Sequence, residues 1–217
     1  FESIYSMDGS IGDIKNIIYL AEKYNCLSYI DEVHAVGMYG ETGAGVSEEM
    51  GLQDKIDIIQ GTLAKAYGNI GGYIASNKII CDYIRSTASG FIFTTSIPPS
   101  IAEAALKSIK YLKKSKKERE IQQENVTFLK KMLLSESINF IENKSHIVPI
   151  MINDATMCKK ISDLLLKKFG HYIQPINFPT VPKGTERLRV TPGPLHTKEM
   201  IIDLIKSLKS CINEINC

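Results

Sequence analysis

Residues 14–30, IKNIIYLAEKYNCLSYI, decide the fold, because a helical period gives way there to a strand-like run. The apolar residues at helical spacing are Ile14, Ile17, Ile18, Ala21 and Tyr24. An apolar run at 27–30 follows them, and another strand-like run, 1–5, precedes the helix. The order strand, helix, strand is typical of the βαβ unit of a mostly parallel sheet. We therefore expect an α/β fold.

Strand-like and helix-like segments keep alternating along the rest of the chain. Further strands are expected at 56–60, 72–75, 147–152, 172–176 and 187–191. Further helices are expected at 78–86, 100–134, 156–168 and 197–215. The pattern restarts after about residue 140. We therefore expect a larger domain at 1–140, which includes the long helix, and a smaller α/β domain at 141–217.

Composition is that of an ordinary globular protein, since 44% of the 217 residues are hydrophobic and 23% are charged. A formal charge of +2 gives no reason to expect a nucleic acid partner, and the basic run 113–117 is expected on a solvated helix face. Because no apolar run approaches the ~20 residues that cross a bilayer, we expect no membrane insertion. The five cysteines show neither a Cys-x-x-Cys pair nor zinc-type spacing, which favours a reducing compartment and no metal.

A lysine in a loop of small residues is the strongest single signal for chemistry. Lys65 lies in the stretch 61–68, GTLAKAYG, directly after an apolar strand. Small neighbours let a bulky cofactor approach the backbone. The alternative is a loop lysine whose amine reaches solvent, which is the more common fate of any one lysine.

An acid and a histidine follow the apolar strand in the stretch 29–37, YIDEVHAVG. Ligands bind at the carboxyl ends of strands in α/β sheets. Asp31 can hold the pyridine nitrogen of pyridoxal phosphate (PLP) protonated, and His34 can reach the neighbouring ring hydroxyl. One alternative is a metal site on Asp31, Glu32 and His34, for which a third ligand at the usual spacing is missing. Another is a strand-end carboxylate and histidine that only bind backbone groups.

Several long motifs in a fixed order resemble the α-oxoamine synthase family of fold-type I PLP enzymes. They are the Asp31-x-x-His34 motif with its glycine-rich continuation to Gly45, the stretch 61–68, and 90–99, GFIFTTSIPP. The stretches 5–9, YSMDG, and 172–189, YIQPINFPTVPKGTERLR, resemble the branch of the family that joins glycine to succinyl-CoA. The resemblance runs almost from end to end, which makes coincidence far less probable than for one short motif.

The resemblance implies a set of residues around the cofactor. Lys65 would carry PLP as a Schiff base and, once freed, act as general base. Asp31 would pair with the pyridine nitrogen and His34 would bind the ring hydroxyl. Ser6 and Thr62 would contact the cofactor, mainly near its phosphate.

The resemblance also implies a shared active site and two substrate contacts. Thr94 and Thr95 would reach the phosphate in the neighbouring subunit of a homodimer; the family usually has serine where this chain has Thr94, and the hydroxyl is kept. Arg189 would clamp the glycine carboxylate in a bidentate pair, and Thr180 would bind the succinyl carboxylate. Arg187, two positions before Arg189, is expected on the opposite side of the strand and in a structural role.

The activity implied is condensation of glycine with succinyl-CoA, with loss of CoA and carbon dioxide, at the entry to haem and tetrapyrrole synthesis. One alternative is a sister enzyme that uses another acyl-CoA, such as 2-amino-3-ketobutyrate CoA ligase or serine palmitoyltransferase. A further alternative is a silent subunit that keeps the fold alone. The loop 177–184 is expected to act as a lid over the acyl-CoA site, with a rigid surface loop as the alternative.

The chain opens on Phe1, directly in a strand-like run. We expect an internal start, with an amino-terminal half and any targeting peptide outside this sequence. The resemblance then implies the mitochondrial matrix as compartment in a eukaryote and the cytoplasm in a bacterium.

Overall fold

The structure, a computed structural model, describes residues 1–216. The chain forms two compact units. Unit 1 consists of Phe1–Tyr5 and Ile11–Lys116, and unit 2 consists of Ser6–Ser10 and the chain from Lys117 onward. Each unit has a three-stranded sheet of its own.

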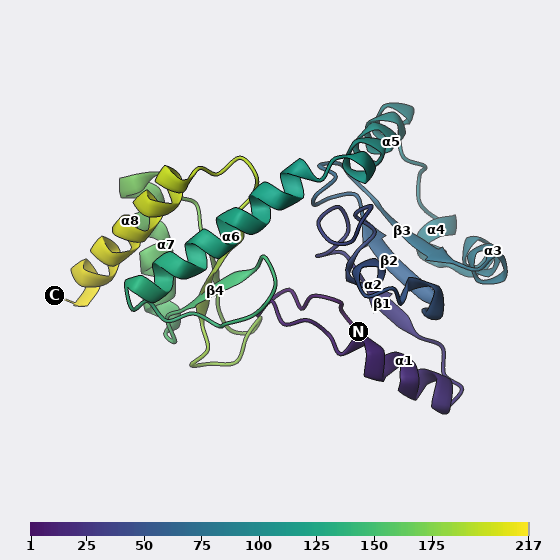
Figure 1. The fold of residues 1–217 in the computed structure, drawn as a ribbon, viewed down its shortest axis with the longest axis horizontal. Helices are drawn as coiled ribbons and strands as arrows, with labels where there is room; N and C mark the ends of the chain where they lie inside the picture. Colours follow the sequence, from purple (N-terminus) through teal and green to yellow (C-terminus); the bar gives the residue numbers. More distant parts are fainter. Residues whose placement is uncertain (217) are drawn as a thin grey trace. The chain divides into compact units, whose positions relative to one another are not determined.

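The sheet of unit 1 has the order β1-β2-β3, with β1 (Tyr29–Asp31), β2 (Ile58–Thr62) and β3 (Gly72–Ser76) (Figure 1). All three strands were predicted, with bounds that differ by one or two residues. β1 and β2 are parallel, as expected, whereas β3 runs antiparallel to β2. Residues 63–71 between β2 and β3 are too few for the crossover that a parallel pair needs. The described sheet is therefore mixed.

The strand expected at 1–5 is only partly formed. Glu2 makes an isolated parallel bridge with Asp31, and Ile4 makes an antiparallel one with Ile11. The Asp31 amide donates to the Phe1 carbonyl at 2.8 Å, and the Ser3 amide donates to the Asp31 carbonyl at 2.9 Å. The segment thus lies along the outer edge of β1 without becoming a regular strand.

The helices of unit 1 include two that were predicted closely, α1 (Ile14–Lys23) and α3 (Lys78–Thr87). α1 buries Ile14 and Ile18, two residues of the helical period. Three short elements were not predicted: α2 (Val46–Glu49), the 3₁₀ helix η1 (Gln53–Lys55) and α4 (Ser89–Ile92). One helical turn is too short to show a period in the sequence.

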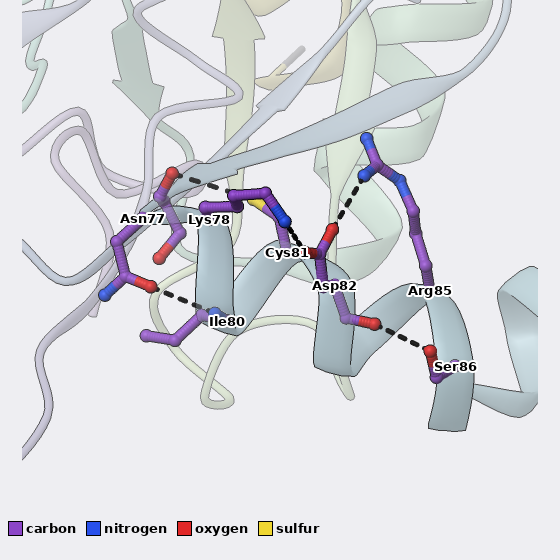
Figure 2. A network of polar contacts seen from close by, with 8 residues as sticks. Asn77, Lys78, Ile80, Cys81, Asp82, Arg85 and Ser86 are labelled. Atoms are coloured by element: carbon purple, nitrogen blue, oxygen red, sulfur yellow. Dashed lines mark hydrogen bonds and ion pairs between the residues drawn. The ribbon is translucent and has the colours of Figure 1, made fainter.

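The start of α3 shows why the sequence predicts it well (Figure 2). Asn77 caps the helix, since its side-chain oxygen accepts from the Ile80 amide at 2.9 Å. Asp82 pairs with Lys78 one turn before it and with Arg85 at 3.2 Å one turn after it. Caps and pairs at i, i+3 and i, i+4 are local, so they can be read from sequence alone.

The prediction of a single long helix at 100–134 is wrong. The structure has two helices instead, α5 (Pro99–Lys114) and α6 (Lys117–Ser135), because Ser115 takes an extended conformation with ψ 128°. The break falls inside the basic run 113–117, where like charges at helical spacing repel. Lys116 instead pairs with Glu41 at 2.6 Å.

Unit 2 packs helices on one face of an antiparallel sheet of order β4-β6-β5 (Figure 1). Its strands are β4 (Val148–Met151), β5 (Gln174–Ile176) and β6 (Arg187–Val190), and its further helices are α7 (Ala155–Phe169) and α8 (Lys198–Asn216). The core includes Leu129 and Leu133 of α6, Ile161 of α7, Leu188 of β6 and Ile205 of α8. α6, which the division at residue 140 assigned to the first domain, therefore packs within unit 2. The domain bounds of the whole protein stay a prediction.

Among residues 1–216, every helix is too short or too polar to cross a bilayer.

Candidate functional site

Asp31 ends β1 at the carboxyl end of the parallel strand pair. It pairs with Gln60 of β2, and its side chain is half-buried. The carboxylate is oriented locally, since its Oδ1 atom accepts from the Val33 amide at 2.8 Å. This is the edge at which α/β sheets bind ligands.

Glu32, the next residue, has a structural role. Its side chain is fully buried, and the carboxylate accepts from the amides of Val46 at 3.1 Å and Ser47 at 2.8 Å. These two amides belong to the first turn of α2, where intrahelical partners are lacking. The metal site weighed on Asp31, Glu32 and His34 does not form, since the described residues hold no group of three or more potential protein ligands.

His34 lies in a turn that brings it to Lys65. The amides of Ala35 and Val36 both donate to the Glu32 carbonyl, at 2.8 and 2.9 Å, which fixes this turn. The Nζ atom of Lys65 is 2.9 Å from Nε2 of His34. The structure thus brings together the two sequence signals, the loop after β2 and the turn after β1.

The loop that carries Lys65 has its own hydrogen bonds. The Gly68 amide donates to the Lys65 carbonyl at 2.9 Å, and the Asn69 amide donates to the Leu63 carbonyl at 2.8 Å. Thr62 closes the base of the loop, because its hydroxyl accepts from the Ala64 amide at 3.1 Å and donates to the Gly71 carbonyl at 3.2 Å. Thr62 therefore shapes the loop in addition to any contact with a ligand.

Tyr73 of β3 lies against Gly61, shortly before this loop, and the sequence does not single it out. It stands opposite Gly61 in the β2–β3 pair, and a Cβ at Gly61 would meet the Tyr73 ring at 2.2 Å. Burial raises the pKa of Tyr73 to about 12, and the neighbouring Tyr67 and Glu32 add to the shift. Its phenol therefore stays protonated at neutral pH. The sequence marks Gly61 as a small residue near Lys65, whereas in the structure a Cβ at Gly61 would first meet the Tyr73 ring.

Thr94 and Thr95 follow α4 and are both exposed. Exposure is what a contact with a second subunit requires, and that contact stays a prediction.

In unit 2, Arg189 is tied to the segment that carries Ser6. The Nε atom of Arg189 donates to the Ser6 carbonyl at 2.7 Å, and burial lowers the pKa of the guanidinium. Arg187 donates from its Nη1 atom to the Met7 carbonyl at 3.3 Å. The expectation that Arg187 faces away from Arg189 is wrong, because residues two apart on a strand lie on the same face.

Arg189 also borders a cavity of about 610 Å³ within unit 2. His171, Tyr172, His196 and Met200 are among the other residues that line it. Its mostly apolar wall with a few polar groups is typical of small-molecule sites. A cavity of about 600 Å³ in unit 1 is lined by Tyr29, Gln60 and Tyr73, and neither cavity is lined by Lys65.

Thr180 lies at the exposed surface of the loop between β5 and β6. Its amide donates to the Asn177 carbonyl at 2.9 Å, and the next residue, Val181, is buried. Gly184 takes a φ of +80°, a conformation that favours glycine. The loop is therefore anchored at Val181 while its Thr180 side chain faces solvent.

The sequence of residues 1–208 matches the family of class I and II aminotransferases. The chain belongs to this aminotransferase family. It is 56% identical over 216 residues to a 5-aminolevulinate synthase of Rickettsia prowazekii, covering 100% of this chain and 52% of that protein. A 5-aminolevulinate synthase of Rhizobium meliloti is 54% identical over 210 residues, covering 97% of this chain and 52% of that protein. The chain thus spans about half the length of these relatives.

A solved structure described as SPT with its PLP internal aldimine has a TM-score of 0.93 and 30% identity to this aminotransferase-family chain. The match covers 99% of this chain and 54% of that one. The family match and this likeness confirm the predicted α/β fold, which is that of the fold-type I PLP enzymes. The roles of the individual site residues stay predictions.

Proposed function

We propose that this aminotransferase-family protein is a 5-aminolevulinate synthase, which uses PLP to condense glycine with succinyl-CoA into 5-aminolevulinate, CoA and carbon dioxide. The observation that carries the proposal is the Lys65–His34 contact at 2.9 Å, which joins the loop after β2 to the turn that follows Asp31 at the end of β1. Identity above 50% to two bacterial 5-aminolevulinate synthases across nearly the whole chain supports this choice of reaction.

The residues of unit 1 fit the functional groups of PLP. An aldehyde needs an amine, a ring hydroxyl needs a hydrogen-bonding partner, and a pyridine nitrogen needs a carboxylate. Lys65, His34 and Asp31 supply these three groups, and the first two lie within hydrogen-bond distance of each other. When bound, PLP supplies the electron sink for a carbanion at the glycine α-carbon.

Each of these side chains then has a defined task. The Lys65 amine binds the cofactor and, after glycine displaces it, removes the α-proton of glycine. His34 orients the amine and the ring hydroxyl. The Asp31 carboxylate, oriented by the Val33 amide, favours a positive charge on the pyridine nitrogen. Thr62 holds the base of the lysine loop and contacts the phosphate.

The substrate contacts are assigned to residues of unit 2. Arg189 binds the glycine carboxylate, and its Nε bond to the Ser6 carbonyl restricts the orientation of the guanidinium plane. Thr180, exposed on its loop, binds the succinyl carboxylate. Ser6 contacts the cofactor phosphate. Thr94 and Thr95 reach the phosphate site of a second subunit in a homodimer. The compartment is the cytoplasm in a bacterium and the mitochondrial matrix in a eukaryote.

The test is turnover by the full-length protein of glycine with succinyl-CoA, acetyl-CoA and palmitoyl-CoA, each measured by CoA release and carbon dioxide release. We expect succinyl-CoA to be preferred and Lys65→Ala to be inactive. A preference for acetyl-CoA or palmitoyl-CoA would identify a sister synthase instead. Absence of turnover, together with no absorbance change on borohydride treatment, would identify a silent subunit.

A further inference from the structure

The residue after Lys65, Ala66, also meets the turn that follows β1, and both segments belong to unit 1. Gly37, three positions after His34, approaches Ala66 so closely that a Cβ at Gly37 would lie 2.6 Å from the Ala66 Cβ. Carbon atoms in favourable contact are about 3.5 to 4.0 Å apart, so a side chain does not fit there. The glycine therefore lets the turn and the lysine loop come together beside the Lys65–His34 contact.

The turn is fixed by its own hydrogen bonds and does not easily move away from an added methyl group. Gly37 is buried and has a φ of +81°, and its amide donates to the Gly43 carbonyl at 2.7 Å. The amides of Met38 and Tyr39 both donate to the Ala35 carbonyl at 3.0 Å. A side chain at Gly37 would therefore push against the lysine loop more than it would shift the turn.

The lysine loop is held by α5 at the residues that follow Ala66. The Ser108 hydroxyl donates to the Tyr67 carbonyl at 2.9 Å, and the Asn69 side chain donates to another carbonyl of the same helix at 3.0 Å. Because the backbone after Ala66 is held in this way, a displacement of Ala66 would be taken up at its other neighbour, Lys65.

We propose that Gly37 is a positioning residue, which sets the place of the Lys65 amine by allowing Ala66 to lie against the turn after β1. The use of this amine for the cofactor rests on the proposed function. What the further inference adds is a residue outside the proposed active site that acts on the lysine through the lysine's chain neighbour. An effect on the chemistry is expected, because a shift of about 1 Å in a reacting group can slow a reaction about a hundredfold.

The test measures how fast PLP joins Lys65 in the full-length protein after its cofactor has been removed by dialysis. The amine and the PLP aldehyde form a Schiff base with loss of one water molecule, and the visible absorbance of the product gives the rate. We expect Gly37→Ala to slow this step about tenfold, since a displaced amine reaches the aldehyde in the reactive geometry less often. Adding Ala66→Gly removes the methyl group that the new side chain meets, and should return the rate to within about twofold of the unaltered one.

Urea unfolding of the same variants separates positioning from a general loss of stability. Gly37→Ala and the double variant both keep an alanine at positive φ, so both should unfold at lower urea concentration than the unaltered protein. Only the double variant should regain the rate of PLP attachment. Gly51→Ala is the matched control, because Gly51 has a φ of +66° and no neighbour within 4 Å, and it should lose stability without slowing the attachment.

Two results would overturn the inference while the proposed function stands. One is an unchanged rate in Gly37→Ala, and the other is a slow rate that Ala66→Gly does not restore or that Gly51→Ala shares. If Gly37→Ala does not fold, Ala66→Val replaces it, since it crowds the same contact from the lysine loop, and an unchanged rate in that variant overturns the inference.

Peptide mapping tests the proposed function separately. Borohydride reduces the C=N bond of the Schiff base to a stable secondary amine, which marks the lysine that carries PLP. We expect the mark on Lys65 in the unaltered protein, and a mark on another lysine would mean that the proposed function itself fails.

Discussion

The Nζ atom of Lys65 lies 2.9 Å from Nε2 of His34, although the two residues are 31 positions apart in the chain. The contact joins the loop after β2 to the turn after β1. It holds the Lys65 amine, which the proposed mechanism uses as cofactor-binding group and general base, beside an imidazole that can share a proton with it.

Replacing Lys65 by alanine is expected to abolish product formation, by about a thousandfold or more in kcat, because the nucleophile and the general base are both lost. The melting temperature should change little, since Lys65 is exposed. CoA release and thermal unfolding measure the two effects. Lys107→Ala, an exposed lysine of α5, is the control. Product well above a trace in Lys65→Ala would remove the lysine from the mechanism.

Asp31→Asn is expected to slow removal of the glycine α-proton by about a hundredfold, because an amide cannot stabilise a positive pyridine nitrogen as a carboxylate does. Asp31→Glu keeps the charge and should lose less. Exchange of the glycine α-proton with deuterium, followed by NMR without the acyl-CoA, isolates this step. An exchange rate in Asp31→Asn equal to that of the unaltered protein would contradict the role given to the carboxylate.

Gly45→Ala is expected to destabilise the protein by about 3 kcal/mol or more, because two effects combine. Gly45 has a φ of +123°, and a Cβ there would lie 2.6 Å from the buried carboxylate of Glu32. Gly51→Ala is the matched control, since Gly51 has a φ of +66° with no neighbour within 4 Å, and it should cost about 1 kcal/mol. Urea unfolding compares the two variants. Equal losses of unfolding free energy in the two variants would mean that the Glu32 side chain moves away from the added Cβ at little cost.

Cys158 is expected to resist alkylation at pH 8 while exposed Cys26 reacts. Burial raises the pKa of Cys158 to about 11, so only about one thiol in a thousand is ionised at that pH, and the thiolate is the reactive form. Peptide mapping after a timed pulse of iodoacetamide separates the cysteines, and the same pulse in denaturant should label both. Equal labelling of the folded protein at the two sites would show that the core of unit 2 opens readily.

Thr180→Ala is expected to raise the KM for succinyl-CoA about tenfold and to slow product release, with glycine deprotonation nearly unchanged. The reason is that its exposed hydroxyl is assigned to the succinyl carboxylate, and the loop 177–184 is predicted to be a lid. Stopped-flow measurement separates these steps, with Thr156→Ala on α7 as the control. If Thr180→Ala slows only glycine deprotonation, the lid prediction is contradicted and the alternative of a rigid surface loop remains.

Local signals explain which parts of the fold could be predicted. α7 is capped at its start by Asp154, whose side chain accepts from the Met157 amide at 2.7 Å, and at its end by Gly170 with a φ of +75°. The break between α5 and α6 could not be predicted in this way. Lysine is a good helix former, and the partner of Lys116 is Glu41, 75 positions away.

The residues of the candidate site also divide into those that the sequence pattern predicts and those that depend on distant contacts. His34 and Lys65 could be placed together because each follows a strand, and the two strands, β1 and β2, are parallel neighbours as the pattern predicts. The turn that carries Ser6 could not be joined to β6, since its bond to Arg189 spans 183 positions and goes to a backbone carbonyl. A carbonyl is present at every residue, so sequence gives no sign of which one is chosen.

Ser6–Ser10 belongs to unit 2 although the segments on both sides of it belong to unit 1, and this limits where the gene can be divided. The residues before and after this segment belong to unit 1, so a single cut after Lys116 would strip unit 2 of the carbonyls that Arg187, Arg189 and Asn143 bind. Buried donors left without acceptors cost about 1 to 3 kcal/mol each. Recombination between related genes at that boundary would therefore yield chimaeras that fold only when the short amino-terminal turn and the distant strand come from compatible parents.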